Sequence, residues 1–275
     1  MNNSPKISVI VPCYNNDQTI IETIESITKQ EYSPVEIIIV NDGSTDKSED
    51  IVSSYIKINN AVNIALINQD NSGPSKSRNN GAEKATGKYL LFLDADDLIA
   101  PSYIKKSIEC LENNPMLNIV YSEAEYFGAK KGKWNLPEFK LPNFLVENCI
   151  PISAIIRNEV FTKVGKFDEN LNFVEDWELW IKIIMEFGGV YQIPETLFYY
   201  RKRFDKSSIT DNENIESIKD WSRLYIYNKH YKYYSEHGYD IVTLTSTKER
   251  SELYKRKYYN VWYRKLFYKL KKNGI

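Results

Sequence analysis

The sequence predicts an α/β fold, with a mostly parallel central sheet, helices on both of its faces and a helical extension at the C-terminal end. Two observations support this fold class. In residues 7–93, runs that are apolar throughout alternate with segments of helical periodicity, which is the pattern of a parallel sheet covered on both faces. From about residue 211 the chain becomes rich in tyrosine, and we expect helices there.

The predicted elements follow one another closely along the chain. Strands are expected at residues 7–11, 35–40, 62–68 and 88–93, and helical segments at 15–30, 42–56 and 73–86. The first helix begins with Asn and Asp and repeats Ile20, Ile24 and Ile27 at helical spacing. Further along, we expect a strand at 118–128, a helix at 174–188 and an extended segment at 190–204.

The composition is that of an ordinary globular protein, with 42% hydrophobic and 27% charged residues. A net charge of −1 gives the chain no general attraction to nucleic acid. No signal peptide is recognised, and no apolar stretch approaches the roughly 18 residues that a membrane span needs. Cys13, Cys110 and Cys149 are widely spaced and match no zinc or disulfide pattern. We therefore expect a cytoplasmic protein.

Three polar clusters, 12–16, 41–46 and 94–97, each follow the end of a predicted strand. Because the carboxyl ends of parallel strands meet at one edge of a sheet, these clusters should converge on one rim, where such folds bind ligands. No G-x-G-x-x-G follows a strand. The sequence between Gly81 and Lys88 is one residue too long for a P-loop, and Tyr89 stands where Ser or Thr would bind magnesium. A dinucleotide-binding fold and an NTPase are therefore disfavoured.

An apolar strand ends in three carboxylates, Asp94, Asp96 and Asp97. Both histidines, His230 and His237, lie near the C-terminus, so a metal site at this strand end would consist of oxygen ligands. Oxygen ligands suit Mg²⁺ or Mn²⁺, which take further ligands from substrate phosphates. The alternative is a turn or helix-capping cluster with no ligand.

The second cluster offers two carboxylates with different predicted roles. Asp42 stands at the strand end itself, where a carboxylate can accept the N3–H of a uracil or thymine ring. Asp46, together with Glu49, resembles a helix-capping pair, and we favour that structural role for it.

Four stretches together resemble the family 2 glycosyltransferases of the GT-A fold: SVIVPCYNN, EIIIVNDGSTDKS, NSGPSKSRNNGAEKATGKYLLFLDADD and VGKFDENLNFVEDWELWIKI. The resemblance covers about residues 6–200. It implies transfer of a sugar from a nucleotide-sugar to an acceptor hydroxyl, with inversion at the anomeric carbon. It also implies a catalytic domain at 1–210, with a nucleotide-binding half (1–117) and an acceptor-binding half (118–210), followed by the helical extension at 211–275.

By similarity to the family, Pro12, Tyr14 and Asn15 line the pocket for the base of the nucleotide. Asp42 holds the pyrimidine, which makes the expected donor a UDP-sugar.

The resemblance also assigns the next two motifs. Gly73 and Arg78 belong to the loop that covers the nucleoside. Asp94 bonds the ribose, and Asp96 binds the Mn²⁺ or Mg²⁺ that bridges both phosphates. Asp97 is a weaker candidate for either of these roles, and the alternative is that it supports its neighbours or caps a turn.

By the same resemblance, Asp176 is the base that takes the proton of the acceptor hydroxyl, and Glu175 beside it is a candidate contact of the acceptor. The alternative is that both acids merely favour a helix N-terminus.

The chain departs from the family at one place. Many relatives carry Tyr-Arg-x-His where this sequence has Tyr200-Arg201-Lys202-Arg203. An arginine cannot ligate a metal, but Arg201 and Arg203 are candidates for contacts with phosphate oxygens. We therefore expect weaker metal binding with partial compensation by a cation. The alternative is a solvated basic strand end.

The C-terminal segment 248–275 carries ten Lys and Arg against two Glu, mixed with aromatic residues. Such a segment can lie peripherally on the anionic inner face of the cytoplasmic membrane, where lipid-linked acceptors reside. It can equally pack on the catalytic domain or form a homodimer. Nucleic acid is not an expected partner because the rest of the chain is acidic.

The resemblance thus implies a metal-dependent, inverting glycosyltransferase that extends a bacterial surface polysaccharide or a lipid-linked glycan. Two alternatives are a nucleotide-sugar-binding scaffold without catalysis and a nucleotidyltransferase. The second lacks its glycine-rich opening loop here.

Overall fold

The computed structural model describes residues 4–59, 63–171, 173–204, 215–244 and 246. It divides into two compact units, Met1–Arg223 and Leu224–Ile275. In the larger unit, the described residues form a mixed nine-stranded sheet with the path β3-β2-β1-β4-β8-β6-β9-β5, and β7 pairs with β6.

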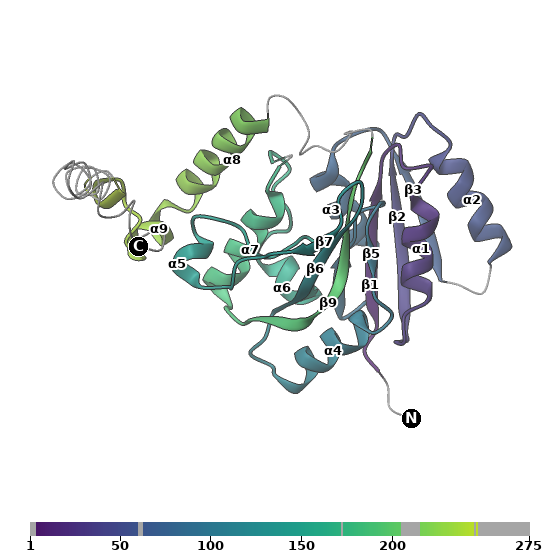
Figure 1. Cartoon of the computed structure of the whole chain (residues 1–275), viewed down its shortest axis with the longest axis horizontal. Helices are drawn as coiled ribbons and strands as arrows, with labels where there is room; N and C mark the ends of the chain where they lie inside the picture. The colour runs from purple at the N-terminus through teal and green to yellow at the C-terminus, as the bar shows by residue number, and fades with distance from the viewer. Residues whose placement is uncertain (1–3, 60–62, 172, 205–214, 245, 247–275) are drawn as a thin grey trace, which may run out of the picture. The chain divides into compact units, whose positions relative to one another are not determined.

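The first half of the sheet is parallel, as the sequence predicts. Its strands are β1 (Ile7–Cys13), β2 (Val35–Asp42), β3 (Ile64–Gln69) and β4 (Tyr89–Phe92). β1 lies between β2 and β4, and β2 pairs with β3, in each case in parallel. Figure 1 shows β1, β2 and β3 side by side. The connections carry helices α1 (Ile20–Thr28), α2 (Ser48–Ile58) and α3 (Pro74–Lys84). Of the predicted strand 62–68, residue 62 lies outside the described residues.

The second half of the sheet is mixed. Its strands are β5 (Leu98–Ile99), β6 (Ile119–Gly128), β7 (Gly132–Trp134), β8 (Ile155–Arg157) and β9 (Val190–Lys202). β8 is antiparallel to both β4 and β6, whereas β6 and β9 are parallel. The helices are α4 (Tyr103–Asn113), α5 (Leu141–Phe144), α6 (Asn158–Lys163) and α7 (Glu175–Glu186).

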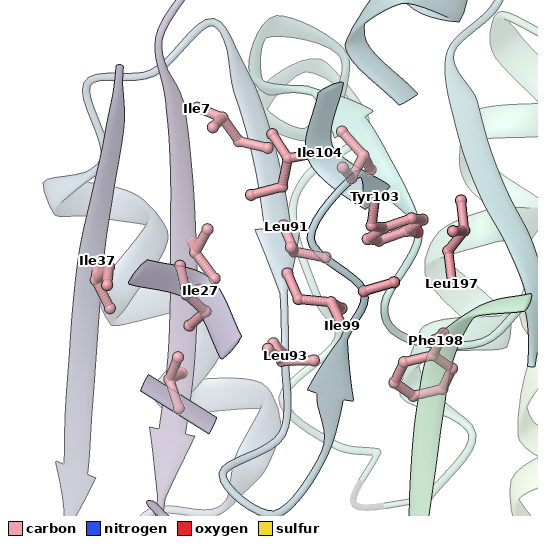
Figure 2. Close-up of a cluster of buried hydrophobic side chains, with 14 of the residues drawn as sticks. Ile7, Ile27, Ile37, Leu91, Leu93, Ile99, Tyr103, Ile104, Leu197 and Phe198 are labelled. Carbon is pink, nitrogen blue, oxygen red and sulfur yellow. The ribbon is translucent and has the colours of Figure 1, made fainter. Parts of the chain in front are cut away.

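One continuous hydrophobic core lies on one face of the sheet. It joins alternate residues of the parallel strands, such as Ile7 and Leu91, to apolar residues of α1 and α4, such as Ile27 and Ile104. Figure 2 shows these side chains together with Phe198 from β9. The cluster therefore spans both halves of the sheet and fixes their relation within the larger unit.

Helix α3 packs very closely on the opposite face. A Cβ atom at Gly81 would meet Ile10 Cγ2 at 2.5 Å and Val40 Cγ2 at 3.0 Å. Both contacts are to β-branched, buried side chains with little freedom to move. The absence of a side chain at Gly81 therefore sets how near α3 lies to β1 and β2.

The described residues of the C-terminal part, 215–244 and 246, are largely helical, as predicted. α8 (Ile215–Lys229) runs across the division between the two units, and α9 (Tyr231–Glu236) follows. In the smaller unit, Ile226 and Tyr234 are buried, and the rings of Tyr227 and Tyr234 meet edge to face. Among the described residues, no helix has the length and apolar character that crossing a membrane requires. The basic segment 248–275 lies outside the described residues.

Candidate active site

The loops that follow β1 and β2 are joined by hydrogen bonds through Asn15. Its backbone N–H donates to Ser44 Oγ at 3.1 Å, and its side-chain Oδ1 accepts the N–H of Thr45 at 2.8 Å. Asn15 has a φ of +52°, which asparagine tolerates better than most residues. The two loops thus form one wall of the rim at the carboxyl ends of the strands.

The remaining predicted pocket residues of the first loop lie at this wall. Pro12 is the sixth residue of β1 and is partly buried, while Tyr14 is 48% exposed. An exposed tyrosine ring beside the rim offers a flat apolar face to a ligand.

Asp42 ends β2 and holds the loop that precedes α3. Its Oδ1 accepts hydrogen bonds from Gln69 Nε2 and from the backbone N–H of Ser72, both at 2.8 Å. Its Oδ2 accepts the N–H of Gly73 at 2.9 Å, and Gly73 has a φ of +86° that suits glycine. A carboxylate has about four lone-pair sites, so one acceptor position remains on Oδ2.

Asp46 has the structural role that we favoured, although not as a capping pair. Its Oδ1 accepts the N–H of Ser48 at 2.9 Å, and its Oδ2 accepts the N–H of Asp17 at 3.0 Å. Burial acts to raise the pKa of Asp46, but these hydrogen bonds and the Ser48 hydroxyl outweigh it, so the pKa lies below its ordinary value. Glu49 instead contacts the amides of Asn41 and Asn68.

Arg78 joins two carboxylates from distant parts of the chain. Its Nη2 lies 2.7 Å from Asp94 Oδ1, and its Nη1 lies 2.5 Å from Glu175 Oε1. Arg78 belongs to α3 and not to a loop, and its side chain is 4% exposed. Burial acts to lower the pKa of Arg78, but Asp94 and Glu175 outweigh burial and raise it.

Asp96 and Asp97 contact the end of β9. Arg203 Nε donates to Asp96 Oδ2 at 2.7 Å, and Arg201 Nε donates to the carbonyl of Asp96, also at 2.7 Å. The backbone N–H of Arg201 donates to Asp97 Oδ1 at 2.8 Å, while Arg201 Nη2 pairs with Glu22. Both arginines therefore bind protein groups at the acidic strand end in this structure.

The two aspartates at this strand end resist ionisation. Burial and the charge of Asp94 raise the pKa of Asp96, and Arg203 offsets part of this increase. Asp97 is fully buried, and its pKa is raised well above the ordinary value by burial and by the neighbouring carboxylates. Its Oδ2 has no hydrogen-bond partner among the described residues. A group held this way supports its neighbours and does not reach a ligand.

Asp176 lies in the first turn of α7 and is partly exposed. Its Oδ1 accepts the N–H of Trp177 at 2.7 Å, and its Oδ2 accepts from Asn148 Nδ2 at 3.2 Å. Burial and the adjacent Glu175 raise its pKa to about 7, and the Trp177 N–H and Arg78 offset part of this increase. A carboxylate with such a pKa can exchange a proton near neutral pH.

The backbone before α7 is strained. Val174, the residue that precedes the helix, has a φ of +55° and a ψ of +26°, in the left-handed region. This conformation is rare for a β-branched residue and costs about 1–2 kcal/mol. Strain of this kind is frequent at functional sites, because the surrounding structure must hold it in place.

Helix α3 holds the segment before α7 by several further contacts. Ser75 Oγ donates to the carbonyl of Leu171 at 2.6 Å. The amide of Asn79 donates to the carbonyl of Phe167 and accepts its N–H, both at 3.0 Å. The start of α7 is therefore fixed by the same helix that carries Arg78.

Several residues of the site were not anticipated from the sequence. Gln69 and Ser72 hold Asp42, and Asn148 contacts the proposed base. Ser72 lies inside the stretch NSGPSKSRNNGAEKATGKYLLFLDADD, but no role was assigned to it, and Gln69 and Asn148 belong to none of the quoted motifs. The partners of all three residues are 27 to 30 residues away, so local spacing gave no signal. Arg78 lay inside a motif, but its two ion-pair partners could not be read from spacing.

The protein groups at the rim suit a metal ion that takes most of its ligands from a substrate. Among the described residues, no group of three or more His, Cys, Asp or Glu side chains is arranged to hold a metal ion. Asp96 nevertheless offers a carboxylate that is 17% exposed, and Mg²⁺ or Mn²⁺ often uses one protein carboxylate together with substrate phosphates. The rim thus suits an ion bound with a diphosphate and not a resident metal.

A separate hollow opens at the other end of β4. Its volume is about 670 Å³, and its lining includes Lys88, Arg157 and Glu159. It follows from the strand direction that this hollow lies away from Asp94 and Asp96. We place the candidate active site at the acidic rim because the reactive groups gather there.

Comparisons with known proteins match the chain over most of its length. The sequence profile described as "Glycosyl transferase family 2" matches residues 8–167. The uncharacterized glycosyltransferase RP339 of Rickettsia prowazekii is 31% identical over 237 residues, which cover 80% of this chain and 71% of that protein. An uncharacterized glycosyltransferase of Haemophilus influenzae is 32% identical over 229 residues, which cover 79% and 76%.

Solved structures share the fold. S. aureus TarS 1–349 in complex with UDP-GlcNAc has a TM-score of 0.64 and 24% identity, covering 78% of this chain and 64% of that one. The mannosyltransferase PcManGT from Pyrobaculum calidifontis, in complex with GDP-Man and Mn²⁺, has a TM-score of 0.60 and 16% identity, covering 92% and 81%. The mixed sheet and its covering helices thus define the GT-A fold. The chain belongs to glycosyl transferase family 2.

Proposed function

We propose that this chain transfers a sugar from a UDP-linked donor to a hydroxyl of a glycan or lipid-linked acceptor, with inversion at the anomeric carbon. The observation that carries the proposal is the partly exposed carboxylate of Asp176 in the first turn of α7, next to the Arg78–Glu175 ion pair. Its raised pKa of about 7 agrees with the role of a base. Arg78 pairs with Asp94 at the proposed donor site and with Glu175, the residue that precedes Asp176. The binding of UDP-GlcNAc by TarS, which shares the fold, supports a nucleotide-sugar donor.

The proposed donor pocket lies between the first two loops. Asp42 has one acceptor position left on Oδ2, which can take the N3–H of a uracil ring. The exposed ring of Tyr14 can stack on the base, with Pro12 and Asn15 forming the wall beside it. We assign the ribose to Asp94, whose carboxylate is 33% exposed although Arg78 binds one of its oxygens.

The proposed transfer is a single displacement. The acceptor oxygen forms a bond to the anomeric carbon while the bond from that carbon to the diphosphate oxygen breaks. The acceptor proton passes to Asp176, which must be ionised beforehand. Activity should therefore fall as the pH drops below the pKa of this carboxyl group.

Asp96 is the residue that we expect to hold Mn²⁺ or Mg²⁺. Such an ion would neutralise the negative charge that develops on the leaving diphosphate. Arg203, which pairs with Asp96, can offset the same charge in part.

The cellular role is proposed from the sequence. We propose that the enzyme acts in the cytoplasm on bacterial surface polysaccharide, and that the basic segment 248–275 contacts the inner face of the membrane. Homodimerisation through that segment is the alternative. The catalytic domain at 1–210 also remains our proposal.

The proposal is tested by donor binding and UDP release. Purified protein is first screened by thermal shift with UDP, GDP and dTDP, with and without Mn²⁺, because a ligand that binds the folded state raises its apparent stability. UDP release from UDP-sugars is then compared for the wild type, Asp176→Asn and the control Glu186→Gln. The control makes the same charge change at an exposed position at the far end of α7.

We expect Asp176→Asn to lower UDP release about 10²–10⁴-fold without weakening UDP binding, since a general base contributes that much. Glu186→Gln should behave like the wild type. If UDP stabilises the protein but no UDP-sugar is turned over, the chain is instead a nucleotide-sugar-binding scaffold.

A further inference from the structure

The buried guanidinium of Arg78 lies between the proposed donor site and the proposed base. It makes its two ion pairs through different nitrogen atoms, Nη2 to Asp94 and Nη1 to Glu175. Because the guanidinium is planar and rigid, one side chain fixes the spacing of both carboxylates. Arg78 comes from α3, Asp94 follows β4, and Glu175 begins α7, so three elements meet at this group.

Neighbouring carboxylates at the start of α7 differ in their surroundings. Glu175 is 9% exposed, and its Oε1 accepts a hydrogen bond from Arg78 Nη1. Asp176 is more exposed and accepts only neutral donors, the N–H of Trp177 and the amide of Asn148, in the hydrogen bonds that the structure shows. Of the two acids, Asp176 is therefore the one that solvent and an acceptor can reach.

We propose that Arg78 is a positioning residue: by pairing with Asp94 and Glu175 together, it holds Glu175 away from the acceptor and leaves Asp176 as the base. This inference rests on the proposed transfer reaction. It replaces the expectation that Arg78 covers the nucleoside and that Glu175 contacts the acceptor.

The charges around Asp176 support this role. Three charged groups face it: Glu175 from its own helix, Arg78 from α3 and Asp94 from the end of β4. Glu175 and Asp94 raise the pKa of Asp176, whereas Arg78 lowers it. Loss of Arg78 should therefore raise the titration midpoint of Asp176, the pH at which half of it is ionised. Loss of the Glu175 charge should lower this midpoint.

The position of Arg78 is itself well fixed. Ser75 and Asn79, on the same helix, bind the backbone of Leu171 and Phe167. Gly81 lets the helix lie close to the sheet. The arginine thus acts from a rigid support, which a positioning residue needs.

The test reads the titration of Asp176 directly and needs no substrate. The full-length protein is labelled with ¹³C at aspartate Cγ, and the Asp176 signal is assigned by its loss in Asp176→Asn. Titrations are recorded for the wild type, Glu175→Gln, Arg78→Lys and the double variant Arg78→Gln/Glu175→Gln. Lys76→Gln is the matched control, because it removes a cation of α3 that pairs with Glu169.

We expect Glu175→Gln to lower the Asp176 midpoint by about 1 pH unit. In the double variant the Asp176 midpoint should lie about 1 pH unit above that of Glu175→Gln, because the double variant also lacks the Arg78 cation. Lys76→Gln should leave the midpoint in place. Arg78→Lys should also keep the midpoint but lower UDP release, because an ammonium group cannot hold both carboxylates in the same plane.

Unchanged midpoints in Glu175→Gln and in the double variant would overturn the inference, even in an active enzyme. If the double variant does not fold, the inference is still tested by the Asp176 midpoint of Glu175→Gln and by the midpoint and UDP release of Arg78→Lys. If the midpoints shift as expected but no UDP-sugar is turned over, the proposed function fails and the electrostatic arrangement stands.

Discussion

Each half of the sheet contributes an acid near the rim, and the pKa values of these two acids are shifted in opposite directions. In the parallel half, Asp46 accepts backbone N–H groups of adjacent loops, and its pKa is lowered. In the mixed half, Asp176 begins a helix beside another acid, and its pKa is raised to about 7. The first arrangement stabilises the fold, and the second keeps a reactive group at a cost in stability. The position of an acid near the rim therefore does not by itself distinguish a structural role from a catalytic one.

The largest expected effect on stability comes from Asp42 in the parallel half. Asp42→Ala removes three hydrogen bonds to the loop before α3 and should lower the free energy of unfolding by about 2–4 kcal/mol. UDP affinity should fall about 10–100-fold, which calorimetry measures. Asp46→Ala is the control, with a smaller loss of stability and unchanged UDP affinity. Equal UDP affinity in both variants would remove Asp42 from the proposed donor pocket.

The comparison of Asp46 and Asp176 is sharpened by unfolding at two pH values. Because the folded protein holds a proton on Asp176 up to about pH 7, this group lowers stability as the pH rises from about 4 to 7. Asp176→Asn should therefore raise the free energy of unfolding by about 1–3 kcal/mol at pH 8 and have little effect near pH 4.

Asp46→Asn should act in the opposite direction. The lowered pKa of Asp46 means that its contribution is present above its unfolded value of about 4 and is lost as the pH falls through the folded one. The variant should lose stability at pH 8. Urea unfolding of both variants measures the difference, and shifts of the same sign would contradict it.

The smallest effect is expected where the halves meet, at the pair of Arg203 with Asp96. Arg203→His removes the cation from Asp96 and adds a side chain able to ligate a metal. We expect the Mn²⁺ concentration that half-saturates UDP binding to fall about 2–10-fold. Lys202→His at the preceding position, the last residue of β9, serves as the control. An unchanged Mn²⁺ requirement in Arg203→His would show that Arg203 does not limit metal binding.

The parallel half could be predicted from local sequence. Largely apolar runs at 7–11 and 35–40 became β1 and β2, because strands buried on both faces are apolar at nearly every position. Their polar residues, Ser8 and Glu36, hydrogen-bond to each other. The acids that end β2 and follow β4 were found for the same reason. Only the ends of the strands differed, by a few residues.

The mixed half could be predicted less well. β8 has three residues and pairs with β4, more than 60 residues earlier, so nothing local marks it. Helix α4 was not predicted, although Ile104, Ile108 and Leu111 repeat at helical spacing. At the site, Arg78 and Glu175 are 97 residues apart, and their pairing depends on packing that local sequence does not encode.

Because α3 lies so close to the sheet, the absence of a side chain at Gly81 affects groups elsewhere in the site. At residue 81 even one methyl group would lift the helix from Ile10 and Val40. Arg78, one turn earlier on α3, would then move with it. Residue 81 must therefore stay a glycine because Arg78, three residues earlier on the same side of the helix, depends on how close α3 lies to the sheet. A substitution at residue 81 should change the acid–base behaviour of the site.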